Sequence, residues 1–169
     1  KATNLPRVVE PSRDYVSTVA GVRLAVRGIA WQQQDTGVGA CATVALWSML
    51  QSSAYDDRHV IPTTAEITSI AHRAGLTERR PFPSTGLSFP QLVAAVRDSG
   101  FAPLVVVGSE VEDLPSHQVP HFDRRHFSSA VCSLLRSGYP VLMAGQLLGP
   151  ADDYKGHHAV CAVGFRQAA

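Results

Sequence analysis

The sequence predicts an α+β protein, on two observations. Helical patterns dominate the first two thirds of the chain, and strand patterns dominate its end. A chain of 169 residues can bury one sizeable core or build two small lobes around a shared groove, and one domain is the expectation. Residues 1–13 are polar and contain proline, so we expect an N-terminal arm or linker there and a single domain over residues 14–169.

The segment before the first cysteine indicates strands, and the segment after it indicates a helix. Tyr15–Trp31 is rich in β-branched residues and is interrupted by Gly21 and Gly28, which predicts one or two short strands. From Ala40 to about Gln51, apolar residues cover most of a helical circumference. This pattern is typical of a central helix that is buried between other elements.

Three further helices and three further strands are predicted downstream. Thr63 with Glu66, and Ser88 with Gln91, have capping-box spacing and open helices that end near glycines. The third of these helices is expected over residues 126–138. A buried strand is expected over 102–107, and two further strands over 140–146 and 157–165. A polar loop joins the last two strands, so they are expected to pair antiparallel.

The composition argues against nucleic acid and membranes as partners. Lys and Arg number 15 against 14 Asp and Glu, which leaves a net charge of +1 and no excess that would attract nucleic acid or an anionic membrane. No apolar run approaches the roughly 20 residues that span a bilayer. The first residues lack the apolar core of a secretory signal, but the chain begins without Met, so cytoplasmic and secreted locations both stay open. Oligomeric state is not predicted.

Neither a disulfide framework nor a metal site is predicted. The chain has an odd number of cysteines, and their spacing is not that of metal-ligand pairs; they are Cys41, Cys132 and Cys161. Cys132 lies beside the apolar stripe of its predicted helix and is expected to pack there. A run containing His117, His121 and His126 is broken by Pro115 and Pro120, so a polar surface loop is favoured over a zinc site. We therefore expect no cofactor.

Cys41 has two interpretations, as a small packed side chain or as a nucleophile. A nucleophile must be a thiolate, so its site needs a positive field and a base. A helix N-terminus supplies part of that field through unpaired N–H groups, and Cys41 stands where the predicted central helix begins. Gly37 and Gly39 allow the backbone to turn onto the helix axis and a substrate carbonyl to approach.

A base for such a nucleophile is available on the last predicted strand. His157 and His158 follow Gly156 directly, and a strand after a glycine turn holds an imidazole rigidly. Strand alternation separates the two: if His158 faces the groove, then His157 and Cys161 face the other way. Cys161 is then expected to be an inert buried thiol. The alternative for His158 is a hydrogen-bonded histidine of the core.

The residues around Cys41 and His158 resemble known catalytic boxes. "CATVALW" opening a helix and "HAVCAVGF" near the end are similar to the cysteine and histidine boxes of papain-like cysteine peptidases. The intervening "GLSFPQLVAAVRDSGF" and "LLRSGYPVLMAG" are closest to the bacterial branch that processes the leaders of exported bacteriocins and to its stand-alone relatives. The likeness covers about residues 32–165. It implies a two-lobed fold in which a helical lobe carrying the cysteine packs on an antiparallel sheet carrying the histidine.

The resemblance also implies roles for individual residues. Cys41 becomes the nucleophile, and His158, the histidine followed directly by "AV", becomes the general base and later the general acid. A glutamine before the cysteine donates to the oxyanion in such families, which favours Gln34 and then Gln33, although Gln34 is one residue further from the cysteine than usual. Removing such a donor typically costs about 10²–10³ in rate.

One corner of the family pattern is missing from this chain. The family's third residue is an Asp or Asn beyond the histidine, and neither type follows His158. Either a truncated C-terminus removed it or another group substitutes, with Asp152 and Asp153 as stand-ins that fit a solvated loop better.

The expected function is a cysteine hydrolase of peptide or isopeptide bonds, with a peptide or protein as substrate. The same dyad would serve an acyl transferase or a deamidase, because only the second nucleophile or the leaving group changes. The alternative from another class is an inactive peptidase-like domain that binds an extended peptide. The missing Asp or Asn favours that alternative, and the presence of both Cys41 and His158 opposes it.

Overall fold

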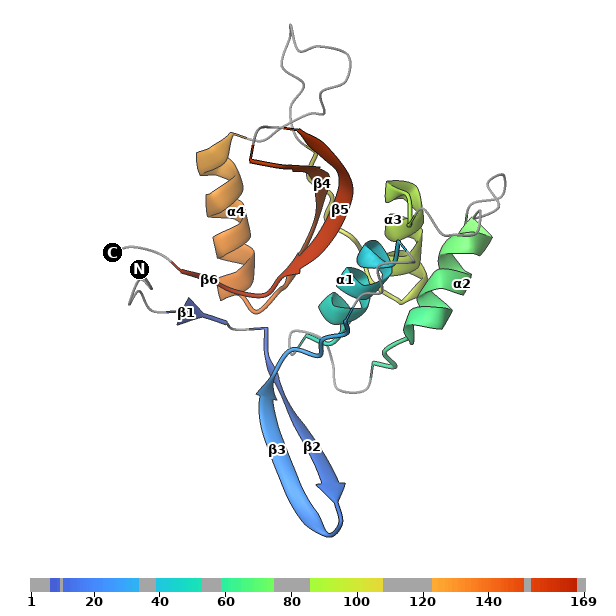
Figure 1. Ribbon diagram of the computed structural model, residues 1–169, viewed down its shortest axis with the longest axis vertical. Coiled ribbons are helices and arrows are strands. Elements are labelled where there is room, and N and C mark those ends of the chain that lie inside the picture. Colours follow the sequence, from blue (N-terminus) through green and yellow to red (C-terminus); the bar gives the residue numbers. More distant parts are fainter. Residues whose placement is uncertain are drawn as a thin grey trace, which may run out of the picture.

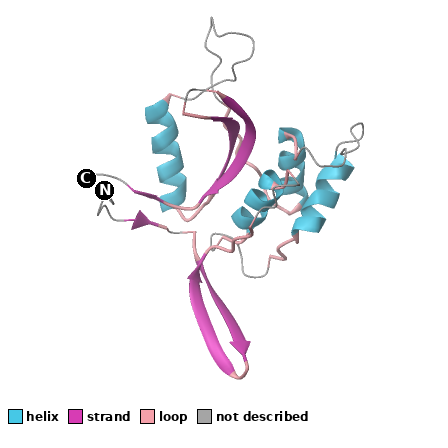
Figure 2. Cartoon of the chain, viewed as in Figure 1, coloured by secondary structure: helices cyan, strands magenta, loops and turns pink. Residues whose placement is uncertain are grey.

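The computed structural model describes residues 7–9, 11–33, 39–52, 59–74, 86–107, 123–150 and 153–166. Helices and strands both occur among them (Figures 1 and 2). The strands are β1 (Arg7–Val8), β2 (Arg13–Val19), β3 (Val22–Gly28), β4 (Val141–Leu148), β5 (Tyr154–Ala162) and β6 (Phe165–Arg166), and the helices are α1 (Cys41–Leu50), α2 (Thr64–Ala74), α3 (Phe89–Asp98) and α4 (Arg124–Arg136). The protein is therefore mixed α+β, as its sequence predicts.

Helix α1 is enclosed on nearly all sides. Seven of its residues are buried, and Leu46 and Leu50 have no exposed surface. A helix that is apolar all round must be covered by other elements, and α1 contacts α2, β4 and β5. The prediction of a central buried helix is confirmed.

Helices α2 and α3 begin with the capping boxes that their sequences predict. The Glu66 carboxylate accepts hydrogen bonds from the backbone N–H of Thr63 at 2.7 Å and from its hydroxyl at 2.9 Å, and these bonds lower the pKa of Glu66. At the start of α3, the backbone N–H of Ser88 donates to the Gln91 side chain at 2.8 Å, and the Ser88 hydroxyl accepts from the backbone N–H of Gln91. Gly100, with a φ of +86°, follows the end of α3. The two helices pack against each other.

The core lies between α1, α2, α3 and one face of β5. Its buried members are Ala42, Ala45, Leu46, Met49, Leu50, Ile67, Leu92, Ala95, Val96 and Ala159. Nine of these belong to helices, and the tenth, Ala159, is contributed by β5. The helices that the sequence pattern predicts therefore supply most of the apolar surface that is buried.

Strands β4 and β5 form an antiparallel pair between α4 and α1 (Figure 1). Val141 lies opposite Ala162 and Leu147 lies opposite Gly156, with a register irregularity after Leu147. Helix α4 contacts β4, and its N-cap Asp123 accepts hydrogen bonds from the backbone N–H groups of the first turn, which lower the pKa of that carboxyl. The predicted antiparallel pair is confirmed.

The prediction of a buried strand over residues 102–107 is wrong. No strand is assigned there, and Leu104, Val106 and Val107 are 78%, 63% and 68% exposed. A β-branched run becomes a buried strand only where a neighbouring strand takes up its backbone hydrogen bonds. In the described part of the chain, the β4–β5 sheet has only two strands, and this run pairs with neither.

The two ends of the described chain meet. Strand β1 pairs antiparallel with β6, with Arg7 opposite Arg166 and Val8 opposite Phe165 (Figure 1). A Cβ atom on Gly164 would lie 2.5 Å from the Val8 carbonyl oxygen, so glycine permits this close approach. Residues 7–8 fall within the range predicted as an arm, yet they pair with the end of the chain.

Strands β2 and β3 form a hairpin that projects away from the rest of the molecule (Figure 1). The turn residues Ala20 and Gly21 both have positive φ, +48° and +80°, as in a type I′ turn. Most residues of both strands are exposed. The strands predicted over Tyr15–Trp31 are confirmed, and they pair with each other.

Candidate active site

Cys41 is the first residue of α1 and is half-buried. The N-cap is Ala40, and within the described part of the chain no side chain caps this end of the helix. No acidic residue stands in the first turn. The N–H groups that open α1 therefore keep their partial positive charge next to the thiol, which is the field that a thiolate needs.

The backbone in front of Cys41 lies against the loop that leads into α3. A Cβ atom on Gly86 would come 3.3 Å from the carbonyl oxygen of Gly39, and Gly86 has a φ of +96°. Both the contact and the backbone angle favour glycine at position 86. Leu87, next in the chain, packs against the core cluster. Two segments that are far apart in the sequence therefore lie close together next to the N-terminus of α1.

Strand β5 lies along α1 with two small side chains, Ala159 and Cys161, inward. Ala159 is 4% exposed and belongs to the same cluster as Ala42 and Ala45 of α1. Cys161, two residues further on, is partly buried against that cluster. Because side chains alternate along a strand, residues 159 and 161 define the face of β5 that meets α1. The alanines let the helix approach this strand closely.

The two histidines lie on opposite faces of the start of β5. His157 pairs in register with Gln146, and His158 pairs with Gly145; both imidazoles are exposed. Alternation places His157 on the face of Ala159 and Cys161, which is the face that meets α1, and places His158 on the opposite face with Val160. His158 carries no neighbouring side chain at its opposite position on β4, because that position is a glycine.

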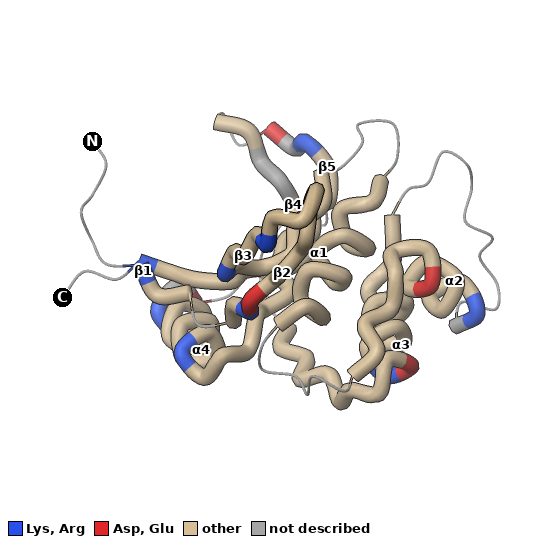
Figure 3. The backbone as a smooth tube through the Cα atoms, turned by 90° about the horizontal axis from the view of Figure 1, so that it is seen from below, with Lys and Arg blue, Asp and Glu red and all other residues tan. Residues whose placement is uncertain are grey.

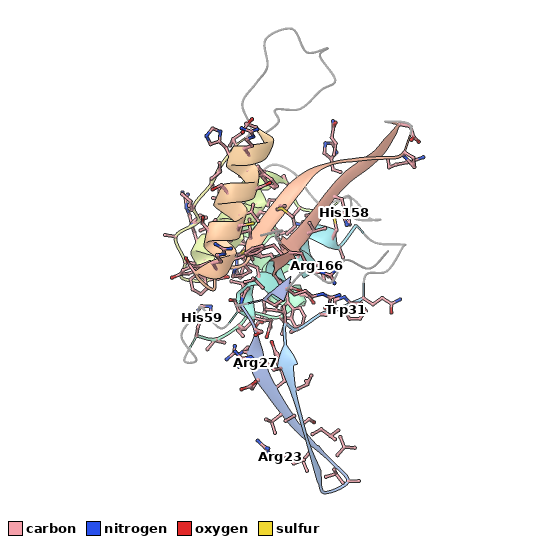
Figure 4. All side chains as sticks on the ribbon, turned by 90° about the vertical axis from the view of Figure 1, so that its left-hand side faces the viewer. Arg23, Arg27, Trp31, His59, His158 and Arg166 are labelled. Atoms are coloured by element: carbon pink, nitrogen blue, oxygen red, sulfur yellow. The ribbon has the colours of Figure 1, made fainter. Side chains whose placement is uncertain are left out.

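The helix and strand that carry the predicted nucleophile and base are therefore in contact. Helix α1 begins at Cys41 and packs against β5, and Figure 4 shows His158 on β5 at the opposite side of the view from His59. His59 packs its ring on Phe101, with centroids 4.3 Å apart. Of these two labelled histidines, only His158 belongs to the strand that packs on α1.

Cys161 is chemically distinct from Cys41. Burial raises the pKa of the Cys161 thiol to about 12, so this sulfur stays protonated at neutral pH and is a poor nucleophile. The prediction of an unreactive thiol in the middle of β5 agrees with this environment. Cys132 is half-buried on α4. Among the three thiols, Cys41 alone opens a helix.

Thr43 is a polar group that sequence reasoning missed. Its side-chain oxygen is buried in the first turn of α1, two residues after Cys41, and has no hydrogen-bond partner in the described part of the chain. Leaving a buried hydroxyl without a partner typically costs about 1–3 kcal/mol. A hydroxyl-bearing residue within the otherwise apolar run "ATVALW" was the available signal.

Several predicted residues lie outside the described chain. They are Gln34, Gly37, Asp152, His117 and His121. Gln33, the second choice for oxyanion donor, is exposed after β3. Asp153 is exposed and forms an ion pair with Lys155, in agreement with a solvated loop. His126 is exposed on α4 beside Asp123.

Charge and hydropathy add no further site. Acidic and basic positions are spread over several elements (Figure 3). Among the described residues, no helix is both long and apolar enough to cross a bilayer. Comparison of the chain with protein-family models, curated proteins and solved structures gave no match. No relative therefore contributes to the assignment of function.

Proposed function

We propose that this protein is a papain-like cysteine hydrolase that cleaves peptide or isopeptide bonds. The observation that carries the proposal is that Cys41 opens α1 while α1 packs on β5, the strand that bears the histidine pair. The likeness of the segments around Cys41 and His158 to the papain-like boxes supports it. So does the position of the thiol next to uncapped backbone N–H groups.

The proposed reaction has two steps. His158 takes the proton of the Cys41 thiol, and the sulfur attacks the carbonyl carbon of the substrate. The C–N bond breaks as the amine takes that proton from the His158 imidazolium, which leaves a thioester on Cys41. A water molecule then gives a proton to His158 and attacks the thioester. The C–S bond breaks, the acid is released, and His158 passes the proton to the sulfur, which restores the thiol.

The developing oxyanion needs donors at its position. The backbone N–H of Cys41 is one, because it lies at the start of α1 where no carbonyl of the helix accepts it. Gln34 is the proposed side-chain donor, by its position in the sequence before Cys41.

The proposal is tested by cysteine alkylation with iodoacetamide between about pH 5 and pH 9, with mass spectrometry to locate each adduct. We expect Cys41 to react faster than Cys132 or Cys161 across this range. His158→Ala should slow its labelling at neutral pH. His157→Ala is the matched comparison, because it removes the adjacent imidazole, which alternation places on the face of β5 that meets α1. The proposal, which assigns the base to His158 by the resemblance, requires that His157→Ala have the smaller effect; the reverse result would assign the base to His157.

Two results would contradict the proposal. One is Cys41 labelling no faster than Cys132 across the pH range. The other is Cys41 labelling that is rapid but indifferent to both histidine substitutions, which would indicate an exposed thiol without a base. A positive result is followed by incubation with a peptide ester and intact-mass measurement, which detects an acyl group on Cys41 before water releases it.

An inactive peptidase-like domain that binds an extended peptide is the second candidate. The position opposite His158 on β4 is Gly145, so no side chain there can orient the imidazole. An acyl transferase or deamidase would give the same alkylation result as a hydrolase. Adding an amine to the peptide-ester reaction distinguishes a transferase, which yields the amide, from a hydrolase, which yields the acid.

A further inference from the structure

The β2–β3 hairpin has two chemically different faces. Paired residues share a face, so the register divides the hairpin cleanly. One face, called here the apolar face, carries Arg13 with Gly28 at its base and then Tyr15 with Val26, Ser17 with Leu24, and Val19 with Val22; the other carries Asp14 with Arg27, Val16 with Ala25, and Thr18 with Arg23. The hairpin is thus patterned like a sheet that has a core on one side and water on the other.

The apolar face is open. Val19, Val22, Leu24 and Val26 are 57%, 60%, 52% and 67% exposed. A two-stranded hairpin is at best marginally stable alone in water, and it normally depends on packing of its apolar face. In the described part of the chain, β2 and β3 pair only with each other. The hairpin therefore presents a surface of the kind that other proteins cover.

The opposite face shows which side meets solvent. Arg27 contacts Asp14 at 3.4 Å, and both side chains are well exposed. Arg23 and Arg27 project from the same side of the hairpin (Figure 4). An anionic partner, such as nucleic acid or a lipid headgroup, would engage these arginines and leave the apolar face uncovered.

We propose that a second copy of this chain covers the apolar face, so that two hairpins pack face to face in a symmetric dimer. A two-fold interface brings the same patch against itself, so the patch must be self-complementary. From Tyr15 to Val22 the apolar face carries no formal charge, and its one charged residue, Arg13, lies at the base of the hairpin, at the edge of the proposed interface. Two such ribbons, packed about 10 Å apart, would form a small sandwich with Arg23 and Arg27 outward.

The size of the patch determines the strength of the dimer. Seven residues per strand give a face about 24 Å long. If the two hairpins run antiparallel, each tip lies over the base of the other, where Trp31 is 77% exposed (Figure 4). Covering these surfaces removes on the order of 1,000 Å² in total from water, near the lower limit of specific interfaces. The dimer is therefore reversible and depends on concentration.

Sedimentation velocity of the whole chain from about 1 µM to about 200 µM tests the proposal. We expect the sedimentation coefficient to rise from monomer toward dimer over this range. Leu24→Glu places a charge in the centre of the apolar face and should raise the dimer dissociation constant at least about tenfold. Ala25→Glu is the matched control, because it adds the same charge one residue away on the opposite face.

Each variant is also checked by circular dichroism and by hydrogen exchange of the hairpin amides. In the wild type, protection of β2 and β3 should rise with protein concentration, and in Leu24→Glu it should not. A wild type that stays monomeric at every concentration overturns the proposal, whether or not it binds another protein or lipid vesicles. Equal weakening by Leu24→Glu and Ala25→Glu also overturns it. The result does not depend on Cys41, so it stands apart from the test of catalysis.

Discussion

The two larger antiparallel pairs of this protein have the same strand pairing and opposite surroundings. Strands β4 and β5 lie between α4 and α1, and Ala159 at their centre is 4% exposed. Strands β2 and β3 project from the body, and Leu24 at their centre is 52% exposed. Both pairs are antiparallel and both are predicted as strands by the sequence, so the pattern that predicts a strand does not predict what will cover it.

The side chains of the two pairs differ in size where a neighbour could approach. On β5 the residues that meet α1 are the small Ala159 and Cys161, with the larger Leu142 of β4 beside them, while the hairpin carries branched residues on its apolar face. Small side chains suit close packing of a helix on a strand, and branched ones suit a contact between two sheets about 10 Å apart. The difference indicates that β4–β5 is already packed against its partner and that the hairpin is not.

Truncating one leucine side chain in each region tests this difference most directly. Leu46→Ala in α1 should lower the free energy of unfolding by about 2–5 kcal/mol, because it opens a cavity in a fully buried site. Leu24→Ala on the hairpin should change it by no more than about 0.5 kcal/mol when the protein is dilute enough to be monomeric. Urea denaturation measures both. Similar losses at the two positions would mean that the hairpin is part of the folded core.

A second prediction concerns the inward face of β5 at alkaline pH. Burial raises the pKa of Cys161 to about 12 in the folded protein, above its value in the unfolded chain. The folded state then binds the proton more tightly, so stability is intact below about pH 9 and falls by up to about 1.4 kcal/mol per pH unit as pH rises toward 12.

Urea denaturation at several pH values above 8 measures this slope. Cys161→Ala should flatten it, whereas Cys132→Ala, a thiol removed from α4, should leave it in place. A slope that persists unchanged in Cys161→Ala would show that another group causes the alkaline loss of stability.

The smallest expected effect lies at the tip of the hairpin. Ala20 has a φ of +48°, and a left-handed backbone costs an alanine roughly 1–2 kcal/mol. Ala20→Asn should recover part of that cost, since asparagine followed by glycine is the preferred pair in such a turn. Hydrogen exchange should slow several-fold across β2 and β3, while the urea midpoint stays unchanged. We expect this because the hairpin opens without unfolding of the rest of the protein; a shift of the urea midpoint would show that the two unfold together.

Much of the fold follows from short stretches of sequence. The capping pair Thr63 and Glu66 makes the predicted bonds, and the central helix begins at the residue after Ala40. The register that separates His157 from His158 also follows from simple alternation. Each of these features depends on contacts within one turn of helix or one strand, so the local chain is sufficient to predict it.

The candidate site was predictable only in part, for a physical reason. Cys41 at a helix start is a local feature, and the sequence was enough to predict it. The unpartnered hydroxyl of Thr43, and the glycine opposite His158, arise from how separate segments come together. A sequence pattern does not specify which groups surround a side chain that packs against distant residues.

Local preferences along the chain thus account for the type of each element, because capping, periodicity and turn geometry act over only a few residues. Tertiary packing alone decided that β5 would be covered by α1, that the β-branched run at residues 102–107 would stay exposed, and that the hairpin would stand free. Burial depends on which apolar surfaces meet, and those surfaces come from parts of the chain that are far apart in sequence.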